Sequence, residues 1–453
     1  MKNVSTAPVK KNDDVTLSID ALNSEGAGVG RVEGFAVFVP GALPGETVTA
    51  HVLKVGGGYA VAKCTEVLSA SKQRVAPRCP VYARCGGCAL QHLAYPAQLA
   101  AKRTFVYDAL KRLGGIDDPK VLDTLGMPAP WRCRNKGSFP FGMDGGEVVF
   151  GFFAGRSHRI VPCADCAIQD ERIVDVMRRV SVWANDNAVP AYDEAAHKGS
   201  LRHVSARVTA AGEVMAVVVT NGPLKHKEAL LEALEGVDSV WHNQNDRDTN
   251  VIFGDTFTLL AGAAALTETI GGKAFSVGPQ SFLQVNAAQA AVLYETAIAL
   301  LDPKPDETVA DVYCGVGTIA LLLSDRCGRV VGIEQVPAAV EDARRNAAQN
   351  GADNAEFLCG NAEDVLPKLV SDGRQIGGVV LDPPRKGCEP AALHAAADSG
   401  AARIVYVSCN PATLARDCRI LLDRGYALVS AQPVDMFPQT SHVETVVLMS
   451  KVR

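Results

Sequence analysis

From about residue 271 onward, short apolar segments alternate with helical ones, and this alternation constrains the fold more than any other feature of the chain. In residues 307–324 and again in residues 328–351, an apolar strand leads through a turn into a helix. Successive strand–helix units predict a mostly parallel sheet with helices on both faces. Ligands of such sheets bind at the carboxyl ends of the strands, so that edge is where functional residues are expected.

The N-terminal part of the chain has a different pattern. Residues 13–68 read as short alternating strands separated by Gly and Pro turns, which predicts a small antiparallel barrel. Most of residues 12–70 resemble the TRAM domain, an OB-like RNA-binding module. We therefore expect an OB-like β-barrel over residues 1–75.

Residues 76–270 lie between these two parts and are expected to form a central α+β domain. A helical pattern at about 94–113 ends at a Gly pair, and this helix is a candidate to pack on the C-terminal domain. The formal net charge of −5 hides an uneven distribution, because residues 76–180 contain 15 Lys and Arg against 10 Asp and Glu. A basic segment in an acidic protein indicates contact with a polyanion, the alternative being a solvated basic face.

The chain has no sequence sign of a membrane protein. Its first residues, MKNVSTAPVKKNDDV, lack the apolar stretch of a signal peptide, and no run of 18 apolar residues occurs. We expect a cytoplasmic protein. The 13 cysteines are then expected to be reduced thiols, ligands or nucleophiles rather than disulfides.

The segment from Asp311 to Thr318, DVYCGVGT, ends one strand and opens a helix. Gly315 and Gly317 allow a tight turn and a close approach of a ligand, and Glu334 ends the next strand, where a carboxylate can accept from ribose hydroxyls. The pattern fits a dinucleotide or S-adenosylmethionine.

Features downstream separate these two cofactors. Asn361 follows the third strand, where it can contact an adenine, and Asp382 follows the fourth strand before two prolines. An Asp-Pro-Pro turn at this strand end is similar to that of nucleic-acid methyltransferases, where it holds the target base beside the methyl donor. This resemblance favours S-adenosylmethionine.

Cys409 is the candidate nucleophile. It ends the fifth strand in YVSCNPATLARD, and Asn410-Pro411 directs the chain out of the strand at that point. A cysteine on a sharp turn after a strand is accessible, as a nucleophile must be.

Three further cysteines, Cys79, Cys85 and Cys88, lie within ten residues, and Cys163 and Cys166 follow later. Four thiolates suit zinc or an iron–sulfur cluster. Zinc would pair the Cys85/Cys88 knuckle with the Cys163/Cys166 knuckle. A redox dithiol at Cys85 and Cys88 lacks the expected strand–helix–strand surroundings.

Several motifs together resemble the RNA uridine-5-methyltransferases. FLQVN at 282–286, DVYCGVGT, LDPPRKG, VSCNPATLARD and HVETVVLM at 442–449 occur in the order found in that family. The resemblance implies an α/β chain with a Rossmann-like class I methyltransferase domain at 271–453. It also implies cofactor contacts by side chains at six positions: Gln284, Tyr313, Thr318, Glu334, Asn361 and Asp382.

The resemblance also implies a mechanism. Addition of the Cys409 thiolate to C6 of uracil would turn the ring into an enolate that attacks the methyl sulfonium from C5. The adduct collapses only when a base removes the C5 proton, and the matching residue is Glu444.

The cysteine pattern, with the barrel, resembles the ribosomal-RNA branch of the family. The resemblance implies a [4Fe–4S] cluster held by Cys79, Cys85, Cys88 and Cys166, with Cys163 as the alternative fourth ligand. We interpret the cluster as structural. It would present basic residues to RNA phosphates, namely Arg78, Arg84, Lys102, Arg132, Arg134 and Lys136.

An enzyme that attacks C6 needs a base outside the stack, so the expected partner is a folded RNA with an accessible uridine. The resemblance favours 23S rRNA, with tRNA as the alternative, and we expect a monomer. A non-catalytic RNA-binding assembly factor would leave Cys409 and Asp382 without a role. An iron–sulfur nicotinamide oxidoreductase would leave the Cys-Asn-Pro turn unexplained.

Overall fold

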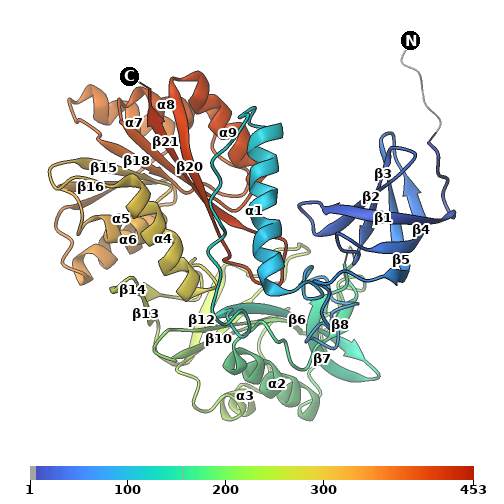
Figure 1. The fold of residues 1–453 in the computed structure, drawn as a ribbon. Helices are drawn as coiled ribbons and strands as arrows, with labels where there is room; N and C mark the ends of the chain where they lie inside the picture. The colour runs from blue at the N-terminus through green and yellow to red at the C-terminus, as the bar shows by residue number, and fades with distance from the viewer. Residues whose placement is uncertain (1–6, 156, 453) are drawn as a thin grey trace.

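The computed structural model describes residues 7–155 and 157–452, which form a barrel, a central sheet domain and a C-terminal sheet domain (Figure 1). Residues 1–6, 156 and 453, which belong to the predicted domain ranges, lie outside the described residues. The predicted fold class is confirmed: an N-terminal five-stranded barrel and a C-terminal α/β domain built on a mostly parallel sheet are both present.

The barrel closes in the strand order β1-β2-β3-β5-β4. Successive side chains along each strand point alternately inward and outward, and the inward ones, such as Val37, Val39 and Val48, fill the interior of the barrel. Gly30 permits close contact between strands, because a Cβ there would lie 2.4 Å from the Ser18 carbonyl oxygen. The strands are β1 (Asp14–Leu22), β2 (Ala27–Val32), β3 (Phe35–Pro40), β4 (Thr47–Val55) and β5 (Tyr59–Ser69).

The central domain is a seven-stranded sheet in the order β12-β11-β10-β9-β6-β7-β8. Helices α2 and α3 cover one face, packing on Phe139, Val204 and Ala206. Strands β9 and β10 form an antiparallel hairpin in the middle of this sheet. The elements are β6 (Lys136–Asp144), β7 (Glu147–Phe153), β8 (Ile160–Pro162), α2 (Glu171–Asp186), β9 (Leu201–Val208), β10 (Val214–Thr220), α3 (Lys227–Ala233), β11 (Ser239–Gln244) and β12 (Thr256–Gly262).

Helix α1 (Tyr95–Arg112) precedes the central sheet in the chain but packs on the C-terminal domain, against α9 (Pro411–Asp423) and β20 (Tyr426–Val434) (Figure 1). Val106 and Leu110 enter the C-terminal core from it. A short hairpin, β13 (Leu266–Ile270) and β14 (Lys273–Val277), leads from the central sheet into that domain.

The C-terminal sheet has the strand order β17-β16-β15-β18-β19-β21-β20. Its first five strands are parallel, and β21 runs antiparallel to both β19 and β20. The strands are β15 (Thr308–Val312), β16 (Arg329–Glu334), β17 (Ala355–Cys359), β18 (Gly378–Leu381), β19 (Arg403–Ser408), β20 (Tyr426–Val434) and β21 (Glu444–Lys451).

Helices cover both faces of this sheet, as the strand–helix alternation predicts. Two separate apolar cores result, one on each side. One core contains α4 (Ala287–Leu301), α5 (Thr318–Leu323) and α6 (Pro337–Gln349). The other contains α1 together with α7 (Ala362–Ser371), α8 (Pro390–Asp398) and α9 (Pro411–Asp423).

The strand order reverses between β15 and β18, which places a crevice at their carboxyl ends. Among the helices of the described residues, none is both long enough and apolar enough to cross a membrane.

Candidate active site and cysteine cavity

The glycine loop after β15 forms one wall of the crevice. The Tyr313 and Cys314 amides donate hydrogen bonds to the Ile333 carbonyl oxygen, 2.9 and 3.1 Å away. Gly315 and Gly317 have φ angles of 55° and 85°, in the left-handed region that favours glycine. The two glycines serve the loop in different ways, because only one of them is packed against protein.

A Cβ at Gly317 would lie 3.0 Å from the Phe357 ring, so this glycine lets α5 approach its neighbours. A Cβ at Gly315 would meet no protein atom within 4 Å. Gly315 therefore borders open space, where a ligand can approach the backbone.

Glu334 ends β16 beside this loop. Its two carboxylate oxygens accept hydrogen bonds from the Gly315 amide (3.1 Å) and the Val336 amide (2.9 Å). These bonds hold the half-buried carboxylate at the edge of the loop, where it can also accept from a hydroxyl of a ligand.

The other predicted cofactor contacts lie on neighbouring elements of the same edge. Thr318 is the buried first residue of α5, and Tyr313 lies half-buried with a φ of 67°. Burial raises the pKa of the Tyr313 phenol, and Cys388 adds to the rise. Asn361 precedes α7, where its Nδ2 donates to Asp364 Oδ2 at 3.1 Å.

Gln284, Asp382 and Glu444 come together around the buried hydroxyl of Tyr294. Burial raises the pKa of Tyr294 well above its ordinary value, the charges of Asp382 and Glu444 raise it further, and a hydrogen bond with Gln284 opposes them. Three residues far apart in sequence therefore act on one buried hydroxyl group.

Cys409 lies half-buried between the end of β19 and the start of α9. Asn410 caps that helix by accepting a hydrogen bond from the Ala412 amide at 3.0 Å, while its Nδ2 donates to the Arg385 carbonyl at 3.3 Å. The Thr413 hydroxyl donates to the same carbonyl at 3.4 Å. The Asp-Pro-Pro-Arg turn is thus held beside the cysteine.

Burial and neighbouring charges shift the pKa values of Cys409, Glu444 and Asp382. Burial raises the pKa of the Cys409 thiol to about 11 and Glu444 adds to the rise, whereas Arg385 lowers it. Burial, followed by the charge of Asp382, raises the pKa of Glu444 to about 8. Burial raises the pKa of Asp382 to about 7. Such acids, poised near neutral pH in a crevice beside a thiol, are typical of an active site.

Asp417, the last residue of the VSCNPATLARD motif, supports this arrangement from behind, a role that the motif alone does not indicate. Its wholly buried carboxylate accepts hydrogen bonds from the Tyr406 hydroxyl (2.6 Å) and the Cys388 amide (2.9 Å). These bonds fix the end of the 382–388 loop against α9.

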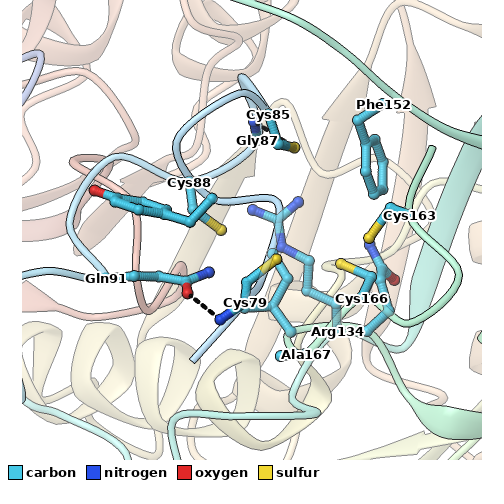
Figure 2. Close-up of a pocket in the computed structure, with 13 residues that line it drawn as sticks. Cys79, Cys85, Gly87, Cys88, Gln91, Arg134, Phe152, Cys163, Cys166 and Ala167 are labelled. Carbon is cyan, nitrogen blue, oxygen red and sulfur yellow. Dashed lines mark hydrogen bonds between the residues drawn. The ribbon is translucent and has the colours of Figure 1, made fainter. Parts of the chain in front are cut away.

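A second site lies in the central domain. Cys79, Cys85, Cys88, Cys163 and Cys166 line an enclosed cavity of about 40 Å³ (Figure 2). The first three lie on the loop before α1 and the other two on the loop after β8.

Polar groups already hold parts of these loops. Gln91 Oε1 accepts from the Cys79 amide at 3.1 Å, and the Gly87 amide donates to Cys85 Sγ at 3.3 Å. The Cys163 thiol donates to the Asp165 carbonyl at 3.4 Å. A hydrogen bond from Cys163 lowers the pKa of Cys166 to about 7 and raises the pKa of Cys163 itself.

Among residues 7–155 and 157–452, no group of three or more His, Cys, Asp or Glu side chains is arranged to hold a single metal ion. The thiols surround a cavity instead of converging on one point. Thiolates are ligands both of iron–sulfur clusters and of zinc, so the residues that line this cavity are a donor set that suits either group.

The predicted set of phosphate-facing basic residues needs correction. Lys102 has an exposed side-chain fraction of 0% and forms an ion pair with Asp435, so it cannot contact RNA. Arg132 forms ion pairs with Asp165 and Glu171, and Arg78 lies over the Trp131 ring. The sequence shows their charge, but burial and pairing depend on distant residues.

Two family models match the chain. The model for tRNA (Uracil-5-)-methyltransferase matches residues 269–452, and the TRAM domain model matches residues 8–65. An uncharacterized RNA methyltransferase of Halalkalibacterium halodurans is 46% identical over 98% of each chain. One from Clostridium tetani is 45% identical over 98% of this chain and 97% of its own.

A solved structure is similar over nearly the whole chain. The Pyrococcus abyssi tRNA (uracil-54, C5)-methyltransferase, in complex with S-adenosyl-L-homocysteine, is 28% identical, with a TM-score of 0.78. The match covers 96% of this chain and 100% of that one. With its TRAM barrel and its glycine-loop domain, the chain belongs to the RNA (uracil-5-)-methyltransferase family.

Proposed function

We propose that the protein transfers the methyl group of S-adenosylmethionine to C5 of a specific uridine in RNA through a covalent adduct with Cys409. The observation that carries the proposal is the half-buried Cys409 thiol, which shares one crevice with Glu444, Asp382 and Arg385. A nucleophile beside two acids of raised pKa suits addition to a ring followed by proton removal.

S-adenosylmethionine supplies an electrophilic methyl sulfonium. Its adenosine would lie along the glycine loop, where the open space at Gly315 and the carboxylate of Glu334 support this placement. The residues proposed to hold it are Gln284, Tyr313, Gly315, Gly317, Thr318, Glu334, Asn361 and Asp382.

Cys409 would add to C6 of the uracil, which makes C5 nucleophilic. The positive charge of Arg385 favours the thiolate over the thiol, which counters the effect of burial. After methyl transfer, Glu444 would take the C5 proton, and the ring would then expel Cys409. Once it is deprotonated, a carboxylate with a pKa near 8 is a stronger base than an ordinary one, so this step should become faster as the pH rises toward 8.

The target base must leave its stack to reach Cys409. Phe282, beside Gln284, has an exposed fraction of 74% and can stack on a displaced base. We propose 23S rRNA as the substrate, on the resemblance to the ribosomal branch of the family. The similarity to the archaeal tRNA enzyme favours tRNA as the second candidate.

We further propose that Cys79, Cys85, Cys88 and Cys166 hold a [4Fe–4S] cluster. It would have a structural role, because the hydrogen bonds of Cys79 with Gln91 and of Cys85 with Gly87 stay within the first loop, and the cluster would join this loop to the second one. We propose that the protein works as a monomer.

The function is tested by mapping 5-methyluridine in the rRNA and tRNA of a strain that lacks this protein. We expect one site to lose its modification, and purified protein with S-adenosylmethionine should restore it. Cys409→Ala should abolish methyl transfer while binding S-adenosylhomocysteine normally. Glu444→Gln should accumulate an RNA–protein adduct on denaturing gels. Methyl transfer by the Cys409→Ala variant would disprove the covalent mechanism, and unchanged RNA modification would disprove the substrate class.

A further inference from the structure

Two cations, Lys136 and Arg207, lie side by side on the central sheet. Lys136 begins β6, and the strand register places it directly opposite Arg207 on β9. Side chains directly opposite on antiparallel strands have Cβ atoms about 5 Å apart, and like charges there destabilise the sheet. The pair therefore needs a physical explanation.

Burial makes this pair more costly. Arg207 has an exposed fraction of 3%, and Lys136 is half-buried. Within residues 7–155 and 157–452, neither side chain forms a salt bridge, and Arg207 Nη1 has no hydrogen-bond partner. Burial, together with the charge of Arg207, lowers the pKa of Lys136 to about 8. Burying a charge is unfavourable unless an opposite charge compensates it.

Glu268 does not neutralise the pair. Glu268 attracts Arg207, but burial outweighs it and lowers the pKa of Arg207 to about 10. The Glu268 carboxylate instead accepts hydrogen bonds from the Ala210 and Thr269 amides, both at 3.0 Å. The positive charge at Lys136 thus remains available to an external anion.

The location indicates which anion this is. Phe139, Val204 and Ala206 face α2 and α3, so the alternation of the strands turns Lys136 and Arg207 to the opposite face. On that face the pair adjoins the segment that leads into the catalytic crevice. Arg207 Nη2 donates to the Ser281 carbonyl at 3.0 Å, and the Asn135 amide donates to the Val285 carbonyl at 2.8 Å.

These two bonds bracket the segment that carries Phe282 and Gln284. A strand whose base enters the crevice at Phe282 would bring a neighbouring phosphate group close to Lys136. We propose that Lys136, with Arg207 behind it, binds an RNA phosphodiester next to the target uridine. This inference rests on the proposed function, and it adds a phosphate subsite that fixes the strand at the mouth of the crevice.

The test measures binding of a fluorescein-labelled uridine dodecamer between about 50 and 200 mM KCl, a range in which phosphate contacts are salt-sensitive. Lys136→Met removes the charge and keeps the length, and Lys136→Arg keeps the charge. Lys227→Met is the matched control, because Lys227 is exposed on α3, which covers the other face of the same sheet.

We expect Lys136→Met to weaken binding roughly threefold near 150 mM KCl and to reduce the slope of log Kd against log salt by about 0.7. Lys136→Arg and Lys227→Met should match the wild type. All four proteins should bind S-adenosylhomocysteine equally, which separates loss of a phosphate contact from a disturbed fold. A wild-type slope and affinity in Lys136→Met would overturn the subsite, as would failure of the wild type to bind the dodecamer.

Two further measurements distinguish an RNA phosphodiester from free phosphate as the ligand, and the phosphate subsite from the proposed function. Inorganic phosphate should not compete with the dodecamer when ionic strength is held constant, and competition specific to the wild type would indicate a free-anion site instead. If Lys136→Met loses binding but the wild type methylates no uridine, the subsite stands and the proposed function fails. If the wild type methylates RNA and Lys136→Met binds normally, only the subsite fails.

Discussion

Lys102 on α1 and Asp435, between β20 and β21, form an ion pair in which neither side chain is exposed to solvent. The Tyr95 hydroxyl also donates to Asp435, at 2.7 Å, and the Lys102 ammonium donates to the Phe437 carbonyl at 3.0 Å. These contacts fasten α1 to the segment that leads into β21, whose first residue is Glu444. The helix before the central domain thus supports the catalytic edge.

Replacing Lys102 by Met should destabilise the protein strongly, because Asp435 would keep a buried charge without a partner. We expect a loss of about 3–5 kcal/mol in the free energy of unfolding, measured by urea denaturation. Lys111→Met, on the exposed face of the same helix, should change it by less than about 0.5 kcal/mol. The double variant Lys102→Met/Asp435→Leu should regain part of the loss, and equal losses in the single and double variants would contradict this explanation.

Replacing Gly315 by Ala should reduce cofactor binding without unfolding the domain. Its Cβ would enter the open space beside the loop, so we expect at least a tenfold weaker affinity for S-adenosylhomocysteine, about 1.4 kcal/mol, by calorimetry. Gly351→Ala is the control, because Gly351 has a φ of 63° and equally open surroundings but follows α6. Both variants should lose about 1 kcal/mol of stability from the left-handed backbone, and equal affinity in the two would refute the placement.

The raised pKa of Glu444 predicts a pH-dependent stability. The folded protein holds the proton up to about pH 8, whereas the unfolded chain releases it near 4.5, so the free energy of unfolding falls as the pH rises between these values. Glu444→Gln lacks this loss. The free energy of unfolding of Glu444→Gln, relative to that of the wild type, should therefore rise by about 2–4 kcal/mol from pH 4.5 to pH 8.

Urea denaturation across this pH range measures the difference. Glu228→Gln, at an exposed position on α3, should show no pH-dependent change relative to the wild type. If the free energies of unfolding of Glu444→Gln and the wild type differed by the same amount at every pH, folding would not raise the pKa of Glu444, and this prediction would be wrong.

The choice between Cys163 and Cys166 can be tested by metal content. The pKa of Cys166 is lowered and that of Cys163 is raised, so Cys166 becomes a thiolate ligand more readily, and we expect Cys163→Ser to retain the cluster and Cys166→Ser to lose it. Iron, acid-labile sulfide and visible absorption are measured after anaerobic purification, with Cys359→Ser, at an exposed position, as the control. Wild-type protein that is brown, with about four irons per chain, supports the cluster. Colourless protein with one zinc would refute it.

Local patterns were enough to predict most of the fold. The alternation of apolar strands and helices after residue 271 predicts the parallel sheet, and the Gly pair predicts the end of α1 close to Arg112. The same reasoning extends to the candidate site. Gly315, Asp382 and Cys409 each follow a strand, and a parallel sheet brings such positions to one edge whatever the strand order.

The sequence by itself therefore determined the elements, the sheet and the edge where the candidate active-site residues meet, because hydrophobic periodicity and turn chemistry act between near neighbours. Only the tertiary structure decided the state of the charges. Lys102 is buried against a partner, Asp435, that lies 333 residues away in the chain. Lys136 on β6 lies directly opposite Arg207 on the neighbouring strand β9, and the protonation of Glu444 depends on burial and on Asp382. Electrostatic energies depend on distance in space and on exclusion of water, and neither can be read along a chain.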